Sequence, residues 1–201
     1  MFTLFWGGNV FAPSTLVEGI PVQDYLQSHY VNAMVELAKY LVGLDNVMGF
    51  GSMNEPSSGY IGVKDLSSEE SVELKYEYSP TPFQGMCLSH GISQRIAFYS
   101  IGVRQYLLNK PDFFEIISPN GVRVWKEGYD CVWFKEGVWS IEDNKPKLLK
   151  PDYFDNYNFG RDFYLPFAQK YDRDLYSKLL PGHKENIGVN GKIIHFSLHS
   201  A

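Results

Sequence analysis

A glutamate that follows an asparagine is the most chemically suggestive feature of this chain. The tripeptide Asn54-Glu55-Pro56 directly follows a short, apolar and nearly uncharged run from Val47 to Met53. Cleaving a glycosidic bond requires one carboxylic acid to protonate the leaving oxygen and a second carboxylate to attack the anomeric carbon or activate water. Glu55 is a candidate for the acid, and the Asn54 amide could hydrogen-bond a sugar 2-hydroxyl as charge develops on the ring. Because a general acid must hold its proton near neutral pH, we expect Glu55 to be partly buried.

A helix and a strand are predicted to position this tripeptide. Apolar residues recur at three- and four-residue steps from Val22 to Leu41, which indicates one helix that ends near Gly43. The stripe consists of Val22, Tyr25, Leu26, His29, Tyr30, Ala33, Met34, Leu37, Ala38 and Leu41. The run from Val47 to Met53 is typical of a fully buried parallel strand. Helix, short loop, buried strand and then polar residues is the pattern of an α/β barrel, whose chemistry lies at the carboxyl ends of its strands.

The flanking segments predict further elements. Met1 to Trp6 fits a strand or a buried helix end that Gly7-Gly8-Asn9 breaks into a loop. A second helix is expected from Asp162, which could cap it, to Leu180, before Pro181-Gly182, with Leu165, Ala168, Tyr171, Leu175 and Leu179 on one face. Lys192 to Leu198 fits another strand.

The middle of the chain is less regular. Pro56 to Gly91 predicts a long loop beside the site, and Ile92 to Leu108 is weakly helical in pattern. Three short runs of aromatic and β-branched residues predict a small antiparallel insertion: Gly121 to Trp125, Cys131 to Phe134 and Val138 to Ile141.

Composition excludes several classes of function. The formal charge of −5 comes without any cluster of Lys and Arg, which argues against nucleic acid as a partner. No apolar run approaches the roughly 20 residues of a membrane span, and no secretion leader is expected. The two cysteines, Cys87 and Cys131, fit reduced thiols of a cytoplasmic protein and leave one disulfide open. His195 and His199 are four residues apart, but no third ligand lies nearby in the sequence, so we expect no metal site.

Aromatic and acidic residues allow two interpretations each. Trp6, Trp125, Trp133 and Trp139 could stack on sugar or contact a lipid, or could pack in a core or hairpin. The carboxylates of Glu69, Glu70, Glu73 and Glu77 could supply a second catalytic acid, but such runs are usually solvated.

Longer motifs carry a resemblance that covers residues 1 to about 180. They include Met1 to Pro13, Val22 to Tyr30, Gly49 to Pro56 with Gly59 to Gly62, Gln84 to Met86, Arg123 to Tyr129, Gly137 to Trp139, Leu148 to Phe154 and Asp162 to Phe167. In this order they resemble glycoside hydrolase family 5, in its glucosylceramidase and steryl-β-glucosidase branch.

The resemblance implies a fold and a substrate class. We expect part of a TIM (β/α)8 barrel, about strands 4–5 and their helices, with a long loop and a small β-hairpin insertion. Residues 1–180 would be the central part of the catalytic barrel and residues 181–201 a divergent tail. Glu55 would be the acid/base of a retaining mechanism on glucosylceramide or steryl glucoside, with Asn54 at the 2-hydroxyl and no cofactor or metal. Trp6, Asn9, Tyr60 and Trp125 are candidate substrate-binding residues, and the lipid substrate allows peripheral membrane contact.

The resemblance also implies missing parts. The nucleophile of the family is a second glutamate after the seventh strand, and no residue here matches it. We therefore expect an internal fragment that is inactive alone. The alternative is a non-catalytic remnant, or a partial gene model, that binds sugar or lipid without cleaving it. Either would expose strand edges and apolar faces, which predicts poor solubility or association.

Overall fold

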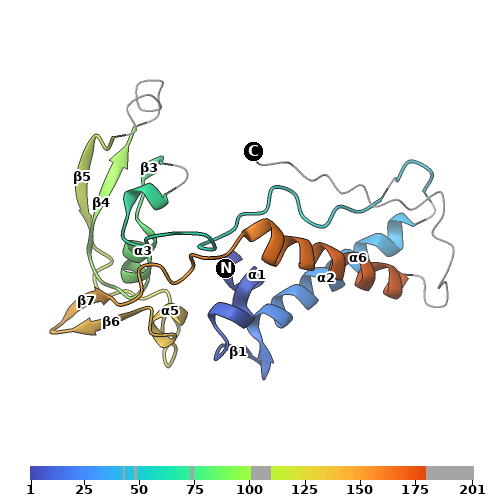
Figure 1. The fold of residues 1–201 in the computed structure, drawn as a ribbon, viewed down its shortest axis with the longest axis horizontal. Helices are drawn as coiled ribbons and strands as arrows, with labels where there is room; N and C mark the ends of the chain where they lie inside the picture. The colour runs from blue at the N-terminus through green and yellow to red at the C-terminus, as the bar shows by residue number, and fades with distance from the viewer. Residues whose placement is uncertain (43, 48, 73–74, 101–109, 180–201) are drawn as a thin grey trace. The chain divides into compact units, whose positions relative to one another are not determined.

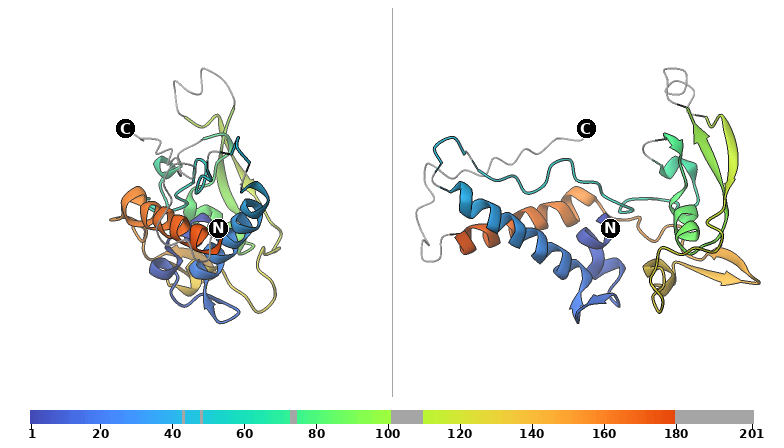
Figure 2. Two further views of the ribbon diagram at one scale, coloured as in Figure 1. Left: turned by 90° about the vertical axis from the view of Figure 1, so that its right-hand side faces the viewer. Right: turned by 180° about the vertical axis from the view of Figure 1, so that it is seen from behind.

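The computed structural model describes residues 1–42, 44–47, 49–72, 75–100 and 110–179, which form two compact units. Unit 1 combines Met1–Gly59 with the chain from Asn158 onward, and unit 2 is Tyr60–Tyr157. Figures 1 and 2 show unit 1 as mainly helical, whereas unit 2 contains most of the strands.

Three helices dominate the described part of unit 1. They are α1 (Phe2–Phe11), α2 (Val22–Leu41) and α6 (Leu165–Leu179), and α1 and α6 each pack against α2 (Figures 1 and 2). A hairpin of β1 (Leu16–Val17) and β2 (Ile20–Pro21) joins α1 to α2. Its two turn residues, Glu18 and Gly19, have φ angles of 54° and 80°. Both are left-handed, as this type of two-residue hairpin turn requires.

The predicted helix from Val22 to Leu41 is confirmed, but its buried face matches the predicted stripe only in part, at Val22 and Ala38. Gln27, Val31 and Val35 are buried, whereas Leu37 is 50% exposed. The Gln27 amide Nε2 donates to the Phe5 carbonyl of α1 at 2.8 Å, and Lys170 of α6 reaches Gln27 Oε1 at 3.3 Å. The neighbouring helices therefore contact α2 on the side of Gln27, which apolar periodicity alone did not indicate.

The expected loop at Gly7-Gly8-Asn9 is wrong, because α1 continues through it with a kink at Gly7. A Cβ atom on Gly7 would lie 2.7 Å from the Phe11 ring, and one on Gly8 would lie 2.8 Å from Val22 Cγ1. The two glycines thus allow close packing of α1 on its own aromatic ring and on α2, rather than a turn.

The buried strand predicted from Val47 to Met53 is also wrong. Its described residues form no strand, and most of them are exposed or half-buried. A central parallel strand needs hydrogen-bonded neighbours on both edges. Because every strand pair in the described ranges is antiparallel, this segment finds no such neighbour there.

The second predicted helix is confirmed with a different start. A π-helical turn, η2 (Gly160–Tyr164), leads into α6. At its start Asn158 and Asp162 bond reciprocally to the backbone: Asn158 Oδ1 accepts from the Arg161 N–H, and Asp162 Oδ2 accepts from the Asn158 N–H, both at 2.8 Å. On the predicted face Ala168, Tyr171 and Leu175 are buried, but Leu165 is 52% exposed. Leu180, the tail 181–201 and the predicted strand from Lys192 to Leu198 lie outside the described residues.

Unit 2 contains short strands and helices. In chain order they are η1 (Glu69–Ser71), β3 (Glu77–Tyr78), α3 (Pro82–Ser89), β4 (Gln94–Tyr99), β5 (Phe113–Ile117), α5 (Val132–Lys135), β6 (Trp139–Glu142) and β7 (Lys145–Leu148). β3, β4 and β5 form an antiparallel sheet in that order, and β6 pairs with β7. Asp143 and Asn144, with φ angles of 49° and 61°, form the turn between β6 and β7.

Of the three runs predicted to form a small antiparallel insertion, only Val138 to Ile141 forms a strand, which is β6. Cys131 to Phe134 contributes to the short helix α5, and Gly121 to Trp125 forms no strand. The helix expected from Ile92 to Leu108 is wrong in its first part, because Gln94–Tyr99 forms the strand β4. Residues 101–109 lie outside the described ranges. Pro56 to Gly91 is less of a loop than predicted, since it contains η1, β3 and α3.

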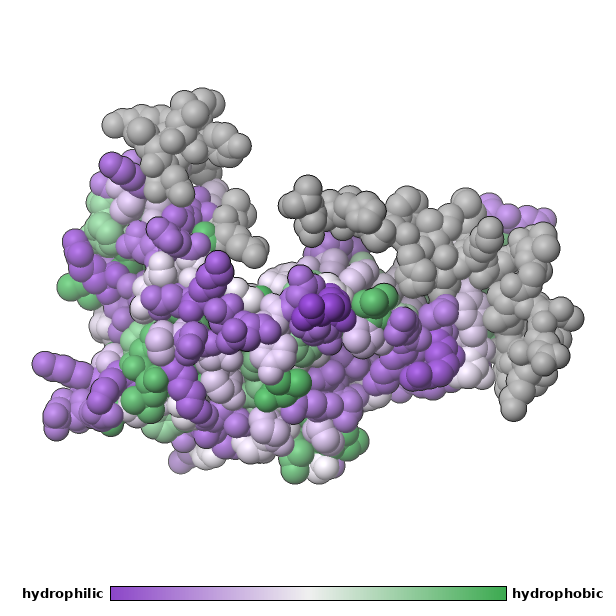
Figure 3. All heavy atoms as spheres, viewed as in Figure 1, coloured by the Kyte–Doolittle hydropathy of each residue, from purple (hydrophilic) through white to green (hydrophobic). Residues whose placement is uncertain are grey.

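The described surface is mixed in character. On the face shown in Figure 3, hydrophobic side chains are scattered among hydrophilic ones. None of the described helices combines the length and apolarity that crossing a membrane demands.

Candidate active site

The loop that carries Asn54, Glu55 and Pro56 belongs to unit 1. Asn54 and Glu55 are exposed, so the expectation that Glu55 is partly buried is wrong. The strand that would have placed Glu55 inside a barrel mouth is not formed in the described residues. Glu55 has a φ angle of 43°, a left-handed conformation that residues with a side chain seldom adopt.

Two tyrosines hold the loop on its N-terminal side. The Tyr30 hydroxyl of α2 donates to the Ser52 carbonyl at 2.6 Å. The Ser52 and Tyr164 hydroxyls lie 3.2 Å apart, and Tyr164 also donates to the Met53 carbonyl at 3.5 Å. Burial, and then the neighbouring Tyr164, raise the pKa of Tyr30, which keeps its hydroxyl protonated as a donor. Ser52 itself is buried, so this anchor is shielded from water.

Trp6 and Gly59 hold the loop on its C-terminal side. The Trp6 indole N–H donates to the Ser57 carbonyl at 2.9 Å. Gly59 has a φ angle of 65°, and a Cβ atom there would lie 2.4 Å from Thr3 Oγ1 of α1. A glycine is therefore needed where the loop crosses α1.

An aromatic cluster orients these anchors. The ring of Trp6 meets Phe5, Phe167, Phe159 and Tyr164 edge-on, with centroid distances of 4.6, 5.1, 5.4 and 5.8 Å. Trp6 is 1% exposed, so its indole cannot turn away from Ser57 without disrupting this packing. Asn54 and Glu55 are thus exposed residues on a loop that is held at both ends.

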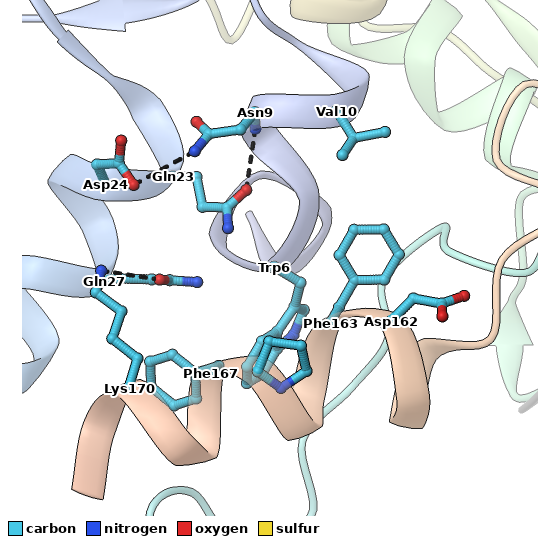
Figure 4. Close-up of a pocket in the computed structure, with 11 residues that line it drawn as sticks. Trp6, Asn9, Val10, Gln23, Asp24, Gln27, Asp162, Phe163, Phe167 and Lys170 are labelled. Atoms are coloured by element: carbon cyan, nitrogen blue, oxygen red, sulfur yellow. Dashed lines mark hydrogen bonds between the residues drawn. The ribbon is translucent and has the colours of Figure 1, made fainter. Parts of the chain in front are cut away.

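A pocket of about 350 Å³ lies among α1, α2, η2 and α6 in unit 1 (Figure 4). It brings together Trp6 and Asn9, two of the predicted substrate-binding residues, whereas Glu55 does not line it. The Asn9 N–H donates to Gln23 Oε1 at 3.0 Å, and Asn9 Nδ2 donates to Asp24 Oδ1 at 3.3 Å.

Tyr60 and Trp125, the other two candidates, belong to unit 2. The Tyr60 ring lies 5.5 Å from Phe154 and 6.2 Å from Trp133, and burial raises the pKa of its hydroxyl. Trp125 is half-buried and donates from Nε1 to Ser89 Oγ at 3.3 Å. Both rings have structural contacts, and their role toward substrate stays a prediction.

The remaining candidates have structural surroundings. Trp133 and Trp139 are buried in unit 2, in agreement with core packing. Cys87 and Cys131 are free and buried, and burial raises the pKa of the Cys87 thiol to about 12. Glu69 accepts from the Tyr99 hydroxyl at 3.2 Å. Over the described ranges, no group of three or more His, Cys, Asp and Glu side chains could hold a metal ion, while His195 and His199 lie outside those ranges.

Sequence reasoning missed the anchoring role of Tyr30, Tyr164 and Ser52. The apolar stripe of its helix includes the Tyr30 ring, and this pattern says nothing about the hydroxyl group. Its hydroxyl contacts a residue 22 positions later, and that of Tyr164 contacts one 112 positions earlier. Helical periodicity carries no information about such long-range partners.

Comparison with known proteins finds relatives whose names agree in pointing to glucosidases. No family model matches the chain. A glucosylceramidase of Rhizopus delemar is 34% identical over 181 residues, covering 85% of this chain and 26% of that protein. An ergosteryl-beta-glucosidase of Saccharomyces cerevisiae is 34% identical over 183 residues, covering 77% of this chain and 24% of that protein.

A solved structure agrees with these relatives. Sterylglucosidase 1 of Cryptococcus neoformans, crystallised with tris, superimposes with a TM-score of 0.76 at 29% identity, covering 88% of this chain and 29% of that one. The chain spans about a quarter of the length of the curated relatives that it matches. By sequence and by fold, the chain is therefore related to the fungal glucosylceramidases and steryl-β-glucosidases, which are glycoside hydrolases, and corresponds to a part of them.

Proposed function

We propose that this polypeptide contributes the acid/base segment of a retaining β-glucosidase that hydrolyses the O-glycosidic bond of glucosylated lipids. The relatives named glucosylceramidase and ergosteryl-beta-glucosidase support this substrate class. The observation that carries the proposal is the loop around Glu55, held by Tyr30 and Tyr164 on one side and by Trp6 on the other. Positioning of a carboxyl group by packed side chains is what general acid catalysis needs.

Glu55 is assigned the proton transfers in this proposal. It protonates the oxygen on the lipid side as the anomeric bond breaks, and then takes a proton from the water that releases the glucose. Asn54 hydrogen-bonds the 2-hydroxyl, an interaction that strengthens in the transition state. Tyr60 and Trp125 are assigned to sugar or lipid contact, and the lipid substrate would be taken from a membrane surface.

The second carboxylate must come from a residue outside this chain. In a retaining enzyme it lies about 5–5.5 Å from the acid and forms the covalent glycosyl intermediate. The proposed fold for the complete enzyme is a TIM barrel, with this chain near its fourth and fifth strands. The DNA on both sides of the coding region tests this directly: an in-frame extension that contains further strands and a late glutamate supports it, and stop codons on both sides contradict it.

A second candidate function is sugar or lipid binding without cleavage. The exposure of Glu55 favours it, because an acid/base carboxyl is normally shielded from water in the working site. The test is hydrolysis of steryl glucoside by the polypeptide from the longest reading frame that contains residues 1–201. Activity that Glu55→Gln removes and Glu18→Gln leaves intact supports catalysis. Glu18 is a suitable control because it is also exposed, with a φ angle of 54°. Absence of activity in the unmodified protein supports binding alone.

A further inference from the structure

The turn that follows β5 places an asparagine and a glycine at the surface of unit 2. Asn120 and Gly121 are both exposed, with φ angles of 51° and 74°. The Val122 N–H donates to the Pro119 carbonyl at 2.9 Å and closes the turn around them. Two consecutive left-handed residues suit this pair, because asparagine tolerates the conformation and glycine has no Cβ atom to obstruct it.

The Asn120 side chain and the Gly121 backbone nitrogen are positioned to react with each other. Attack of a backbone nitrogen on the amide carbon of the preceding asparagine closes a five-membered ring. A side chain on the second residue normally obstructs this approach, but the space around Gly121 is open, since a Cβ atom built there would meet nothing within 4 Å. The Gly121 N–H also has no hydrogen-bond partner within the described ranges, so the attacking atom is available.

Two serines act on the amide group that would be attacked. The Ser93 hydroxyl donates to Ser118 Oγ at 2.9 Å, and the Ser118 hydroxyl donates to Asn120 Oδ1 at 3.2 Å. A donor on Oδ1 stabilises the negative charge that develops on this oxygen during the attack. The rotation that brings the Gly121 nitrogen to Cγ opens the turn and breaks the bond between Val122 and Pro119. The loss of one exposed backbone hydrogen bond is a small obstacle to the reaction.

We propose that Asn120 is a site of spontaneous modification, which converts it to isoaspartate and aspartate without an enzyme. The Gly121 nitrogen loses its proton and bonds to Asn120 Cγ, while the side-chain nitrogen leaves as ammonia. Water then opens the resulting succinimide ring. Its attack on the main-chain carbonyl gives isoaspartate, and its attack on the side-chain carbonyl gives aspartate. In total, water is consumed, ammonia is released, and the site gains one negative charge at neutral pH.

The isoaspartate product lengthens the backbone at a closely packed point. A Cβ atom on Gly91 would lie 2.9 Å from the Gly121 carbonyl oxygen, so the two main chains are in close contact there. Shortly after it, the Val124 N–H donates to the Ser89 carbonyl at 3.1 Å, and Trp125 Nε1 donates to Ser89 Oγ at 3.3 Å. One additional main-chain carbon before these contacts shifts their register. The modification should therefore loosen Trp125, one of the predicted substrate-binding residues.

The test is incubation of the 201-residue chain in mildly alkaline buffer, followed by peptide mapping with fragment ions that localise each change. Asn120 should lose its amide about tenfold faster than Asn144, or faster still, because a side chain follows Asn144. Asn144 is the matched internal control: it is exposed, has a φ angle of 61° and lies in a hairpin turn, but Lys145 follows it. Labelling by a protein isoaspartate methyltransferase identifies the isoaspartate product. The Asn190-Gly191 pair lies outside the described residues and maps to a separate peptide.

Concentrated urea separates the effect of the fold from that of the sequence. The unfolded chain gives the rate of an unstructured Asn-Gly pair, and the folded chain should stay within about tenfold of it, because one hydrogen bond opposes opening. A much slower folded chain would show that the turn protects Asn120 and would overturn the proposal, as would equal rates at Asn120 and Asn144. Ser118→Ala should slow the reaction in the folded chain but not in urea. An unchanged folded rate in that variant would contradict activation by Ser118.

The effect on the loop has a separate readout in the ¹⁵N-labelled chain. The Trp125 indole N–H resonance, assigned by its loss in Trp125→Phe, should split as the isoaspartate fraction grows, and that of Trp6 in unit 1 should not. Asn120→Asp is the matched control, because it adds the charge without lengthening the backbone, and it should show a single Trp125 resonance. An unsplit Trp125 resonance in a chain that contains isoaspartate would overturn the predicted effect on the loop. No step requires glucoside hydrolysis, so the outcome is independent of the role of Glu55.

Discussion

The indole N–H of Trp6 lies 2.9 Å from the carbonyl oxygen of Ser57, a residue 51 positions later and two residues beyond Glu55. This bond joins the first helix of the chain to the loop that carries the proposed acid. Trp6 is also held by four neighbouring rings. The aromatic cluster of unit 1 therefore positions the loop as well as stabilising the fold.

Replacement of Trp6 by Phe should remove this hydrogen bond and leave a buried ring. Trp139→Phe is the matched control, because Trp139 is also 1% exposed but its Nε1 has no partner among the described residues. Both changes create a similar cavity, so Trp6→Phe should cost about 1 kcal/mol more free energy of unfolding. Urea denaturation of both variants measures the difference, and equal losses would show that the bond to Ser57 adds no stability.

Loss of the Tyr30 hydroxyl should release the other end of the loop. Tyr30→Phe removes the donor to the Ser52 carbonyl and should lower the free energy of unfolding by about 1 kcal/mol. Tyr25→Phe on the same helix should change it little, since the Tyr25 hydroxyl makes no hydrogen bond in the described part of the chain. Hydrogen exchange should also increase at Ser52 and Met53 in Tyr30→Phe only. Unchanged exchange there would contradict the anchoring role.

Alkaline pH should weaken the same contact. The pKa of Tyr30 is raised in the folded state by burial and by Tyr164, so the unfolded state releases the proton first. The stability contributed by Tyr30 is complete below the ordinary tyrosine pKa of about 10 and is lost as pH rises through the folded value. Thermal midpoints measured above pH 9 should fall more steeply for the unmodified chain than for Tyr30→Phe. Parallel curves would argue against this coupling.

The left-handed backbone at Glu55 gives a test that needs no substrate. At a φ angle of 43°, a side chain costs about 1 kcal/mol that glycine avoids. Glu55→Gly should therefore be at least as stable as Glu55→Ala, although glycine gains more entropy on unfolding. Thermal unfolding of the two variants compares them directly. A clearly less stable glycine variant would indicate a different backbone conformation at this position.

Local patterns predicted the two long helices well. The apolar spacing from Val22 and the repeat at Ala168, Tyr171 and Leu175 are properties of single segments, so α2 and α6 followed from them. The helix α3 was missed although Thr81 and Gln84 carried a readable sign. They form a reciprocal capping box, with bonds of 3.2 and 2.9 Å, before a helix that starts at Pro82.

Features that depend on partners far along the chain were not predictable in this way. The apolar run from Val47 to Met53 has the composition of a buried strand, but strand formation requires neighbouring strands to accept its hydrogen bonds. The glycines at 7 and 8 suggested a turn, yet contacts with Phe11 and Val22 explain them. Asn54 and Glu55 were found from their motif, whereas the tyrosines and the tryptophan that hold their loop required the tertiary structure.

The most direct test of the proposed function compares two substrates in one variant. In the polypeptide from the longest reading frame that contains the chain, Glu55→Gln should lower kcat/KM for steryl glucoside by about 10²–10⁴-fold. An aryl glucoside with a good leaving group should form its glycosyl intermediate nearly normally. Azide, which needs no general base, should then release that intermediate as β-glucosyl azide. The account predicts this selective loss with azide rescue, and an equal loss on both substrates without rescue would contradict the role of Glu55 as the acid/base.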